Sequence, residues 1–163
     1  LPVLGLFPHI LVGPMIGIAQ GAYDDYVADM RERVSTYNAT RLAEYAQLQM
    51  RVAEASTLIK AARLLAHDNI REAEDISQSG RIPTVVEKTR WRRDGAYAAQ
   101  NCVKSIQIMQ TAIGAAGNYQ SNPFQRRFRD MHAAASQIQV SFDINGAEFG
   151  RVELGLEARN RLI

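Results

Sequence analysis

A long stripe of apolar residues, spaced three and four positions apart, limits what this chain can fold into more than any other feature of its sequence. The stripe runs through residues 40–77 without a proline or a glycine. This spacing places the side chains on one face of an α-helix, so it predicts one long amphipathic helix. The stripe consists of Leu42, Tyr45, Leu48, Val52, Ala55, Ile59, Ala62, Ala66, Ile70, Ala73 and Ile76.

Two further long helices are predicted, one on each side of this stretch. The first covers residues 7–34, with Pro14 as its start or as a kink, and residues 35–39 connect it to the second. The third opens with the capping box Thr84-Val-Val-Glu87 and runs to Gly114-Ala-Ala-Gly117. Small residues at several positions of its apolar seam would let helices approach closely. The seam is Ala96, Ala99, Val103, Ile106, Met109 and Ile113.

A fourth helix is predicted to begin after Asn122. Asn122 is a good N-cap, Pro123 fits the first helical position, and Gln125 completes a capping-box spacing. The apolar stripe of this helix continues to Phe142, and Asn145-Gly146 is expected to break it before a short helix in residues 147–156. That stripe is Phe124, Phe128, Met131, Ala135, Ile138 and Phe142.

Four helices with short connections predict an all-α fold, an antiparallel four-helix bundle with a short extra C-terminal helix. The apolar seams are longer than one bundle covers, so we expect a homo-oligomer, a dimer or a tetramer. Residues 1–22 carry no acidic or basic side chain but contain three prolines. We interpret them as a helix buried in a larger assembly, and neither as a membrane span nor as a signal peptide, and we expect the chain to be part of a longer polypeptide.

Charge and cysteine content exclude several classes of function. The net charge of +2 in 163 residues argues against a nucleic-acid partner or an anionic membrane surface. The single Cys102 excludes an internal disulfide, and with three histidines it argues against a zinc site. Cys102 lies in an apolar helical stretch, so we interpret it as a buried, inert thiol in a reducing, cytoplasmic compartment.

Candidate chemistry lies on the fourth helix, where a polar stripe borders the apolar one: Gln125, Arg129, His132, Ser136 and Gln139. The stripe is either the edge of the solvated face or a ligand-contacting rim of the core. His132 is a plausible general acid or base. The Glu-x-x-His motif of di-iron bundles is missing at both His67 and His132.

Two other features each allow either a purely structural or a functional interpretation. Gly114 and Gly117 either end a helix or allow a ligand to approach the backbone closely. Arg90, Arg92 and Arg93 either solvate the first turns of the third helix or contact a phosphate.

Several of these motifs together resemble the C-terminal domain of flavin-dependent monooxygenases with the acyl-CoA dehydrogenase fold. The resembling enzymes are oxygenase components of two-component systems, of the 4-hydroxyphenylacetate and 3-hydroxy-9,10-secosteroid hydroxylase type. The resemblance is strongest over residues 110–156, and Gly13-Pro14 with Gly17-Ile-Ala resembles the first helix of that domain. Its motifs are Gly114-Ala-Ala-Gly117, Asn122-Pro-Phe-Gln-Arg126, Arg129-Asp-Met-His132, Asp143-Ile-Asn-Gly146 and Gly150-Arg-Val.

The resemblance implies that residues 1–163 are the C-terminal, flavin-binding and oligomerisation domain of such an enzyme, lacking an N-terminal helical domain and a central β-domain. A separate reductase would supply reduced FMN or FAD, and a flavin C4a-hydroperoxide would hydroxylate a small phenolic substrate. His132 matches the catalytic histidine of the family. Positions near the flavin, partly across a subunit contact, map to Gln110, Gly114, Gly117, Asn122, Gln125 and Arg126.

Two alternatives remain open at this stage. Acyl-CoA dehydrogenases of the parent family remove an α-proton with a glutamate, commonly eight residues after the Asp of the Arg-Asp motif; that position is Ile138 here. Other members carry the glutamate early in the first bundle helix, where this chain has no acid before Asp24. The second alternative is a helical oligomerisation module without activity, which is also how the isolated domain is expected to behave.

Overall fold

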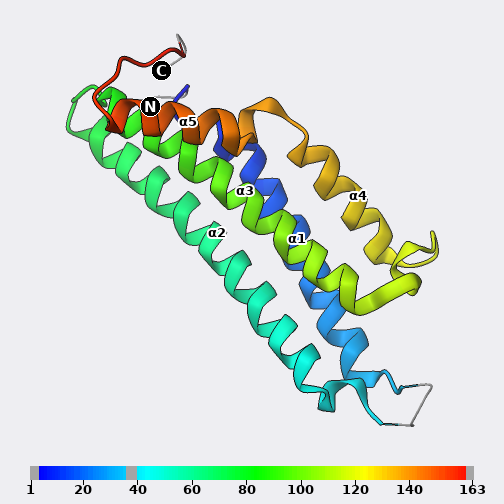
Figure 1. The fold of residues 1–163 in the computed structure, drawn as a ribbon. Helices are drawn as coiled ribbons and strands as arrows, with labels where there is room; N and C mark the ends of the chain where they lie inside the picture. Colours follow the sequence, from blue (N-terminus) through cyan, green and yellow to red (C-terminus); the bar gives the residue numbers. More distant parts are fainter. Residues whose placement is uncertain (1–3, 36–39, 161–163) are drawn as a thin grey trace.

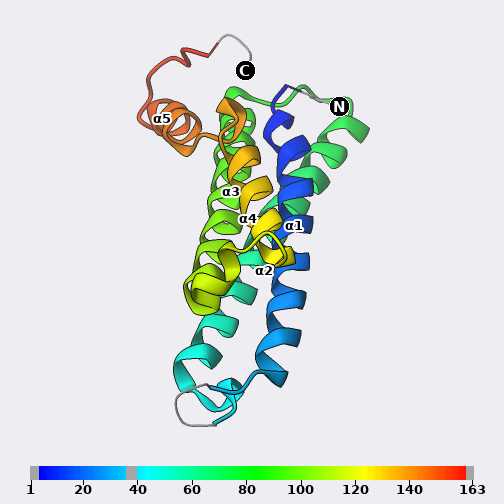
Figure 2. The ribbon, with the colours of Figure 1, turned by 90° about the vertical axis from the view of Figure 1, so that its right-hand side faces the viewer.

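The structure of this protein is a computed structural model, which describes residues 4–35 and 40–160. Three long helices follow one another up and down the bundle, each antiparallel to the one before it: α1 (Phe7–Glu32), α2 (Ala46–Gln78) and α3 (Val85–Ile113) (Figure 1). Two shorter ones follow, α4 (Pro123–Ala135) and α5 (Phe142–Glu153). Helices α1 to α4 form the predicted antiparallel bundle. The extra helix α5 turns away from the bundle axis and packs beside the first part of α3 (Figure 2).

The predicted helix boundaries agree with the structure where a cap marks them. Pro14 lies inside α1, so it is not the start of that helix. The α2 helix begins later than predicted, after a 3-10 turn at Leu42–Glu44. Of the predicted connector, residues 36–39 lie outside the described part of the chain. Val34 and Arg41, on either side of it, form an isolated antiparallel bridge.

The capping box at the start of α3 is confirmed. The Thr84 hydroxyl accepts a hydrogen bond from the Glu87 backbone N–H at 3.2 Å, and the Glu87 carboxylate accepts one from the Thr84 N–H at 2.7 Å. Arg81 also donates to both carboxylate oxygens of Glu87, each at 2.8 Å. This guanidinium, together with the cap, lowers the pKa of Glu87 to about 2. The turn between α2 and α3 is therefore fixed by one carboxylate.

Small residues let the three long helices approach closely at the centre of the bundle. Alanines of α1, α2 and α3 are fully or almost fully buried there: Ala19, Ala22, Ala55, Ala62, Ala98 and Ala99. A second, smaller apolar cluster lies at the end of α2 and the start of α3, around the fully buried Trp91. The indole N–H of Trp91 donates to Glu72 on α2 at 2.6 Å, and Arg90 forms an ion pair with the same carboxylate.

The predicted apolar stripe of α2 is wrong at one position. Ile70 is 40% exposed, and the buried residue is its neighbour Asn69. The Asn69 side-chain nitrogen lies 3.2 Å from Nε2 of the buried His9 on α1. A polar residue can replace an apolar one in the seam here because it has this partner.

The prediction that α4 continues to Phe142 is wrong as well. The helix ends at Ala135, and the Ser136 hydroxyl donates back to the His132 carbonyl at 2.8 Å. Ser136 and Gln139 therefore lie beyond α4 and do not continue its polar stripe. A 3-10 turn at Ile138–Val140 leads into α5, so the predicted break at Asn145-Gly146 falls inside a helix.

The cause of this change of direction is a buried polar network. Asn145 is 2% exposed and donates to the carbonyls of Gln139 and Ser141 at 3.0 and 2.8 Å. Arg92 donates to Asn145 Oδ1, to Gln139 Oε1 and to the Leu4 carbonyl at 3.1, 3.1 and 2.8 Å. These bonds hold the turn against α3, and burial lowers the pKa of Arg92.

The arginine cluster of α3 is thus not a solvated surface. Arg92 is 5% exposed, and Arg90 pairs with Glu72. Arg93 donates to Asp94 and lies over the Phe149 ring, with its guanidinium carbon 3.9 Å from the ring centroid. All three guanidinium groups have protein partners.

The uncharged N-terminal stretch forms the first turns of α1. Val12 and Met15 are buried, whereas Phe7 and Ile10 are 37% and 60% exposed. That a larger assembly covers this outer face stays a prediction. Within residues 4–35 and 40–160, no helix combines the length and apolarity that crossing a bilayer requires.

Candidate functional site

The turn between α3 and α4 brings most of the predicted cofactor residues together. Gly114 ends α3 with a positive φ of 69°, a conformation that favours glycine. Gly117 is buried, and a Cβ atom there would lie 2.7 Å from Gln110 Oε1 and 3.0 Å from Ile113 Cγ2. The backbone at Gly117 therefore packs against the last turns of α3 with no room for a side chain.

Gln110 has a polar atom without a partner next to this glycine. Its side-chain nitrogen donates to Asn118 Oδ1 at 2.9 Å, while Oε1 is buried and accepts no hydrogen bond. A buried acceptor left unpaired costs free energy, so the amide is suited to accept a bond from a ligand that enters here.

Asn122 caps α4 as predicted and also ties the turn to that helix. Its Oδ1 accepts from the Phe124 N–H at 3.0 Å, and its Nδ2 donates to the Ala116 carbonyl at 3.1 Å. The Gln125 backbone N–H donates a hydrogen bond to the Asn122 carbonyl, but the Gln125 side chain does not bind the Asn122 backbone. The predicted reciprocal capping box is therefore not formed. Asn122 thus sets the angle between the turn and α4.

Two cavities meet at this cap. One, of about 510 Å³, is lined by Ile113, Ala116, Tyr119 and Phe124 and by the acidic side of α1, including Asp25, Tyr26 and Asp29. The other, of about 570 Å³, includes Arg126 and Arg127. Both share Ser121, Asn122 and Pro123. Arg126 is highly exposed and its Nε lies 3.6 Å from Asp130, which lines the same cavity.

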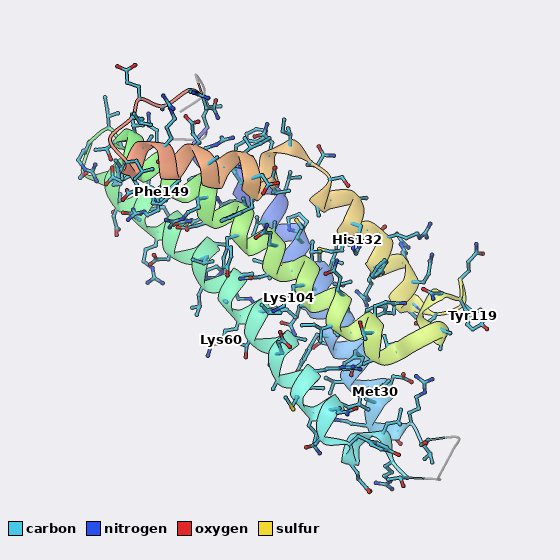
Figure 3. The ribbon with its side chains drawn as sticks, viewed as in Figure 1. Met30, Lys60, Lys104, Tyr119, His132 and Phe149 are labelled. Carbon is cyan, nitrogen blue, oxygen red and sulfur yellow. The ribbon has the colours of Figure 1, made fainter. Side chains whose placement is uncertain are left out.

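His132 lies apart from the turn, ten positions after Asn122, or about 15 Å along the helix axis. Figure 3 shows it farther along α4 from the turn that carries Tyr119. Its Nδ1 lies 2.8 Å from the Phe128 carbonyl, and its ring stacks on Phe128 with centroids 4.2 Å apart. A carbonyl only accepts, so Nδ1 carries the proton, and in the neutral ring Nε2 has the free lone pair.

A third cavity, of about 510 Å³, begins one helical turn beyond His132. Ala135 lines it together with Ser141, Phe142 and several residues of α3, including Asn101, Lys104 and Gln107. Ala135 follows His132 by three positions, so both lie on the same side of α4. His132 itself is not among the residues that line this cavity, and its ring turns back toward Phe128.

Sequence reasoning missed three residues that shape the site. Arg127 reaches Asp25 on α1, the Tyr26 hydroxyl is buried without a partner, and Asn118 binds Gln110. The first is a contact between α1 and α4, about a hundred residues apart in sequence, which no local pattern reveals. Asn118 stands in the predicted loop, and its type alone suggested only a turn.

The described residues contain no group of three or more His, Cys, Asp or Glu side chains placed to hold a metal ion. Cys102 is buried as predicted, and burial raises the pKa of its thiol to about 12. The thiol is therefore uncharged near neutral pH and is a poor nucleophile.

Comparison with known proteins identifies relatives over most of this chain. The family model described as "Acyl-CoA dehydrogenase, C-terminal domain" matches residues 9–142. The oxygenase component of an FADH2-dependent resorcinol hydroxylase from Rhizobium is 30% identical over 99% of this chain and 41% of its own length. The oxygenase component of p-hydroxyphenylacetate 3-hydroxylase from Acinetobacter baumannii is 25% identical over 87% of this chain and 34% of its own length.

The fold agrees with that of solved structures. The crystal structure of 3-HSA hydroxylase from Rhodococcus sp. RHA1 superposes with a TM-score of 0.89 and 26% identity, over all of this chain and 41% of that one. This chain therefore spans about two fifths of the length of the relatives it matches.

Proposed function

This chain belongs to the acyl-CoA dehydrogenase C-terminal domain family, and on that premise we propose that it is the helical bundle domain of the oxygenase component of a flavin-dependent monooxygenase acting on a phenolic compound. Two relatives that are named as oxygenase components of hydroxylases support the proposal. One is a resorcinol hydroxylase and the other a p-hydroxyphenylacetate 3-hydroxylase. The observation that carries it is His132, whose ring is fixed by Phe128 with Nε2 free, on a helix that borders a cavity.

The turn between α3 and α4 fits a flavin. Gly117 leaves the space that the Gln110 amide occupies, and the orphaned Gln110 Oε1 offers an acceptor there. Arg126 and Arg127 line the neighbouring cavity and suit the phosphates of the cofactor. Gly114, Asn122 and Gln125 shape the turn and the start of α4. We assign these residues to flavin binding, with FAD as the first candidate because the resorcinol hydroxylase is named as FADH2-dependent.

Reduced flavin, when bound, would supply the two electrons that activate dioxygen, one atom of which enters the substrate while the other leaves as water. The role we propose for His132 is to accept a hydrogen bond or a proton at Nε2 from the phenol hydroxyl. Removing that proton raises the electron density of the aromatic ring, which favours attack on electrophilic oxygen. The Nδ1 bond to the Phe128 carbonyl keeps the ring in the tautomer that this role requires.

The dehydrogenase alternative has less support. Its base would have to be a carboxylate, but the matching position is Ile138, which is 65% exposed in the turn before α5. The early turns of α1 contain no acid either. An α-proton of an acyl thioester therefore has no carboxylate base at either position.

We further propose that the protein is a homo-oligomer of the cytoplasm, a dimer or a tetramer, and that a separate reductase supplies its reduced flavin. The term "oxygenase component" in the names of relatives supports the existence of a separate reductase component. Exposed apolar side chains on α2 and at the start of α3 support the oligomer, among them Met50, Leu64, Val85 and Val86.

The test uses the polypeptide that contains this domain together with the remaining domains of the fold. Reduced FAD or reduced FMN is supplied with oxygen, and hydroxylation of resorcinol and of p-hydroxyphenylacetate is measured. His132→Gln should lower kcat by about 10²–10⁴-fold. His67→Gln is the matched control, because His67 is exposed on α2.

Three results would contradict the proposal or part of it. Unchanged turnover in His132→Gln would remove the catalytic role of the imidazole. Anaerobic reduction of the bound flavin by an acyl-CoA, without hydroxylation, would establish the dehydrogenase. A purified 163-residue chain that holds stoichiometric flavin would contradict the expectation that this domain alone is an oligomerisation module.

A further inference from the structure

Arg127 of α4 crosses the surface of α1 at a glycine. An added Cβ at Gly21 would lie 3.0 Å from the Arg127 guanidinium carbon and closer still to Nη1. Any side chain at this position would therefore occupy the space of the guanidinium. Gly13 and Gly17, earlier on the same helix, have nothing within 4 Å of an added Cβ.

The guanidinium ends on an acid one turn further along α1. Nε and Nη2 of Arg127 both donate to Asp25 Oδ2, at 3.0 and 2.8 Å. Asp25 follows Gly21 by four residues, so the two lie on one side of α1. We call Gly21, Asp25 and Arg127 the Gly21 clamp.

The clamp lies on one edge of α4, and His132 lies near the other. Phe124 and Met131, which are 3% and 0% exposed, face the core between the edges. Arg127 reaches α1, whereas Ala135, on the side of His132, lines the cavity against α3. A rotation of α4 about its own axis that moves one edge must therefore move the other.

We propose that Arg127 is a positioning residue, which uses Asp25 across the gap at Gly21 to fix the rotation of α4 and thereby the direction of the His132 ring. The catalytic importance of that direction rests on the function proposed above. Asp25 and Arg127 keep 46% and 35% of their side-chain surface exposed. An ion pair that exposed adds little to stability, so its contribution is one of geometry.

The clamp also stands between the two cavities that meet at Asn122. Asp25 lines the acidic one and Arg127 the cationic one. Displacing the guanidinium would therefore also change the wall of the proposed phosphate site.

The test compares Gly21→Ala with Gly17→Ala. Both variants gain the same helix propensity, but only alanine at position 21 meets a side chain. The chain has three histidines, so the ring signals of His132 can be assigned in NMR spectra by comparison with His132→Gln. We expect Gly21→Ala to shift the His132 ring signals, whereas the His132 signals of Gly17→Ala stay at the wild-type positions.

A double-mutant cycle connects the effect to the guanidinium. In an Arg127→Gln background, Gly21→Ala should leave the His132 signals where Arg127→Gln alone puts them. Arg127→Gln alone removes the clamp without adding a clash, and it should shift the His132 signals in the same direction as Gly21→Ala. Identical His132 spectra for wild type, Gly21→Ala and Arg127→Gln would overturn the proposal.

Turnover of the flavin-loaded enzyme separates this proposal from the proposed function. We expect Gly21→Ala to lower kcat more than it changes KM for the phenol. If the His132 signals shift but kcat does not change, the clamp is supported and the catalytic role of His132 is contradicted.

Discussion

Arg92 and Asn145, far apart in the sequence, share a buried hydrogen bond of 3.1 Å between Nε and Oδ1. The bond fixes α5 to α3 and, through the carbonyls that Asn145 binds, shapes the turn between α4 and α5. All the hydrogen-bond acceptors of Arg92 are neutral oxygens. This buried charge therefore depends on complete hydrogen bonding to remain stable.

Asn145→Ala should destabilise the fold by about 1–3 kcal/mol, because it leaves buried polar groups of Arg92, Gln139 and Ser141 without their partner. Urea unfolding followed by circular dichroism measures the change. Asp143→Ala, at an exposed position of the same helix, is the control and should change stability little. Equal midpoints for the two variants would mean that the network does not support the fold.

The protein should lose stability as the pH falls below 6.5, in part through His9. Burial lowers the pKa of His9 below its usual 6.5. In acid the unfolded chain therefore binds a proton at His9 that the folded chain does not, and the free energy of unfolding decreases. His9→Gln should flatten this part of the stability profile, measured by urea unfolding at several pH values. A profile of His9→Gln that coincides with that of the wild type would contradict this assignment.

Stability should also fall in alkali, because burial raises the pKa of Cys102 from 9.0 to about 12. Between these values the unfolded thiol releases a proton that the folded one keeps, so the free energy of unfolding decreases as the pH rises. Cys102→Ala should reduce this loss in thermal melts above pH 9.0. Rapid reaction of the native thiol with a disulfide reagent near neutral pH would show that it is not buried.

Gly117→Ala should weaken flavin binding about tenfold, or ~1.4 kcal/mol, in the polypeptide that carries the whole fold. The added methyl group requires Gln110 to move away from the turn. Flavin affinity is measured by fluorescence quenching during titration. Gly150→Ala on α5, where a Cβ meets nothing within 4 Å, is the matched control. Equal affinities for both variants would remove Gly117 and Gln110 from the proposed flavin site.

The sequence predicts the bundle well where local chemistry decides the structure. The limits of α3 depend on Thr84, Glu87 and Gly114, whose capping interactions involve only near neighbours. Asn122 is recognisable as a cap for the same reason. The seam of α2 is wrong at Ile70 because a contact with His9, on another helix, makes Asn69 the buried residue.

Only part of the candidate site can be predicted from the sequence. Gln110, Gly117 and Asn122 come together because one short turn holds them, so a local motif predicts them as a group. The end of α4 is not predictable in this way, since Arg92 supplies the bonds that redirect the chain from a distant helix. Arg127 was also missed, because its partners Gly21 and Asp25 lie at the other end of the sequence.

The buried Trp91, whose indole binds Glu72, is an intrinsic fluorescence probe of the bundle. Trp91 is the only tryptophan among these 163 residues, and its indole is fully buried, with its N–H bound to a carboxylate of α2. Its fluorescence emission therefore reports the separation of α2 and α3 without an attached dye. Any disturbance that parts the end of α2 from the start of α3 will be visible as a shift of emission to longer wavelengths, even where the helices themselves persist.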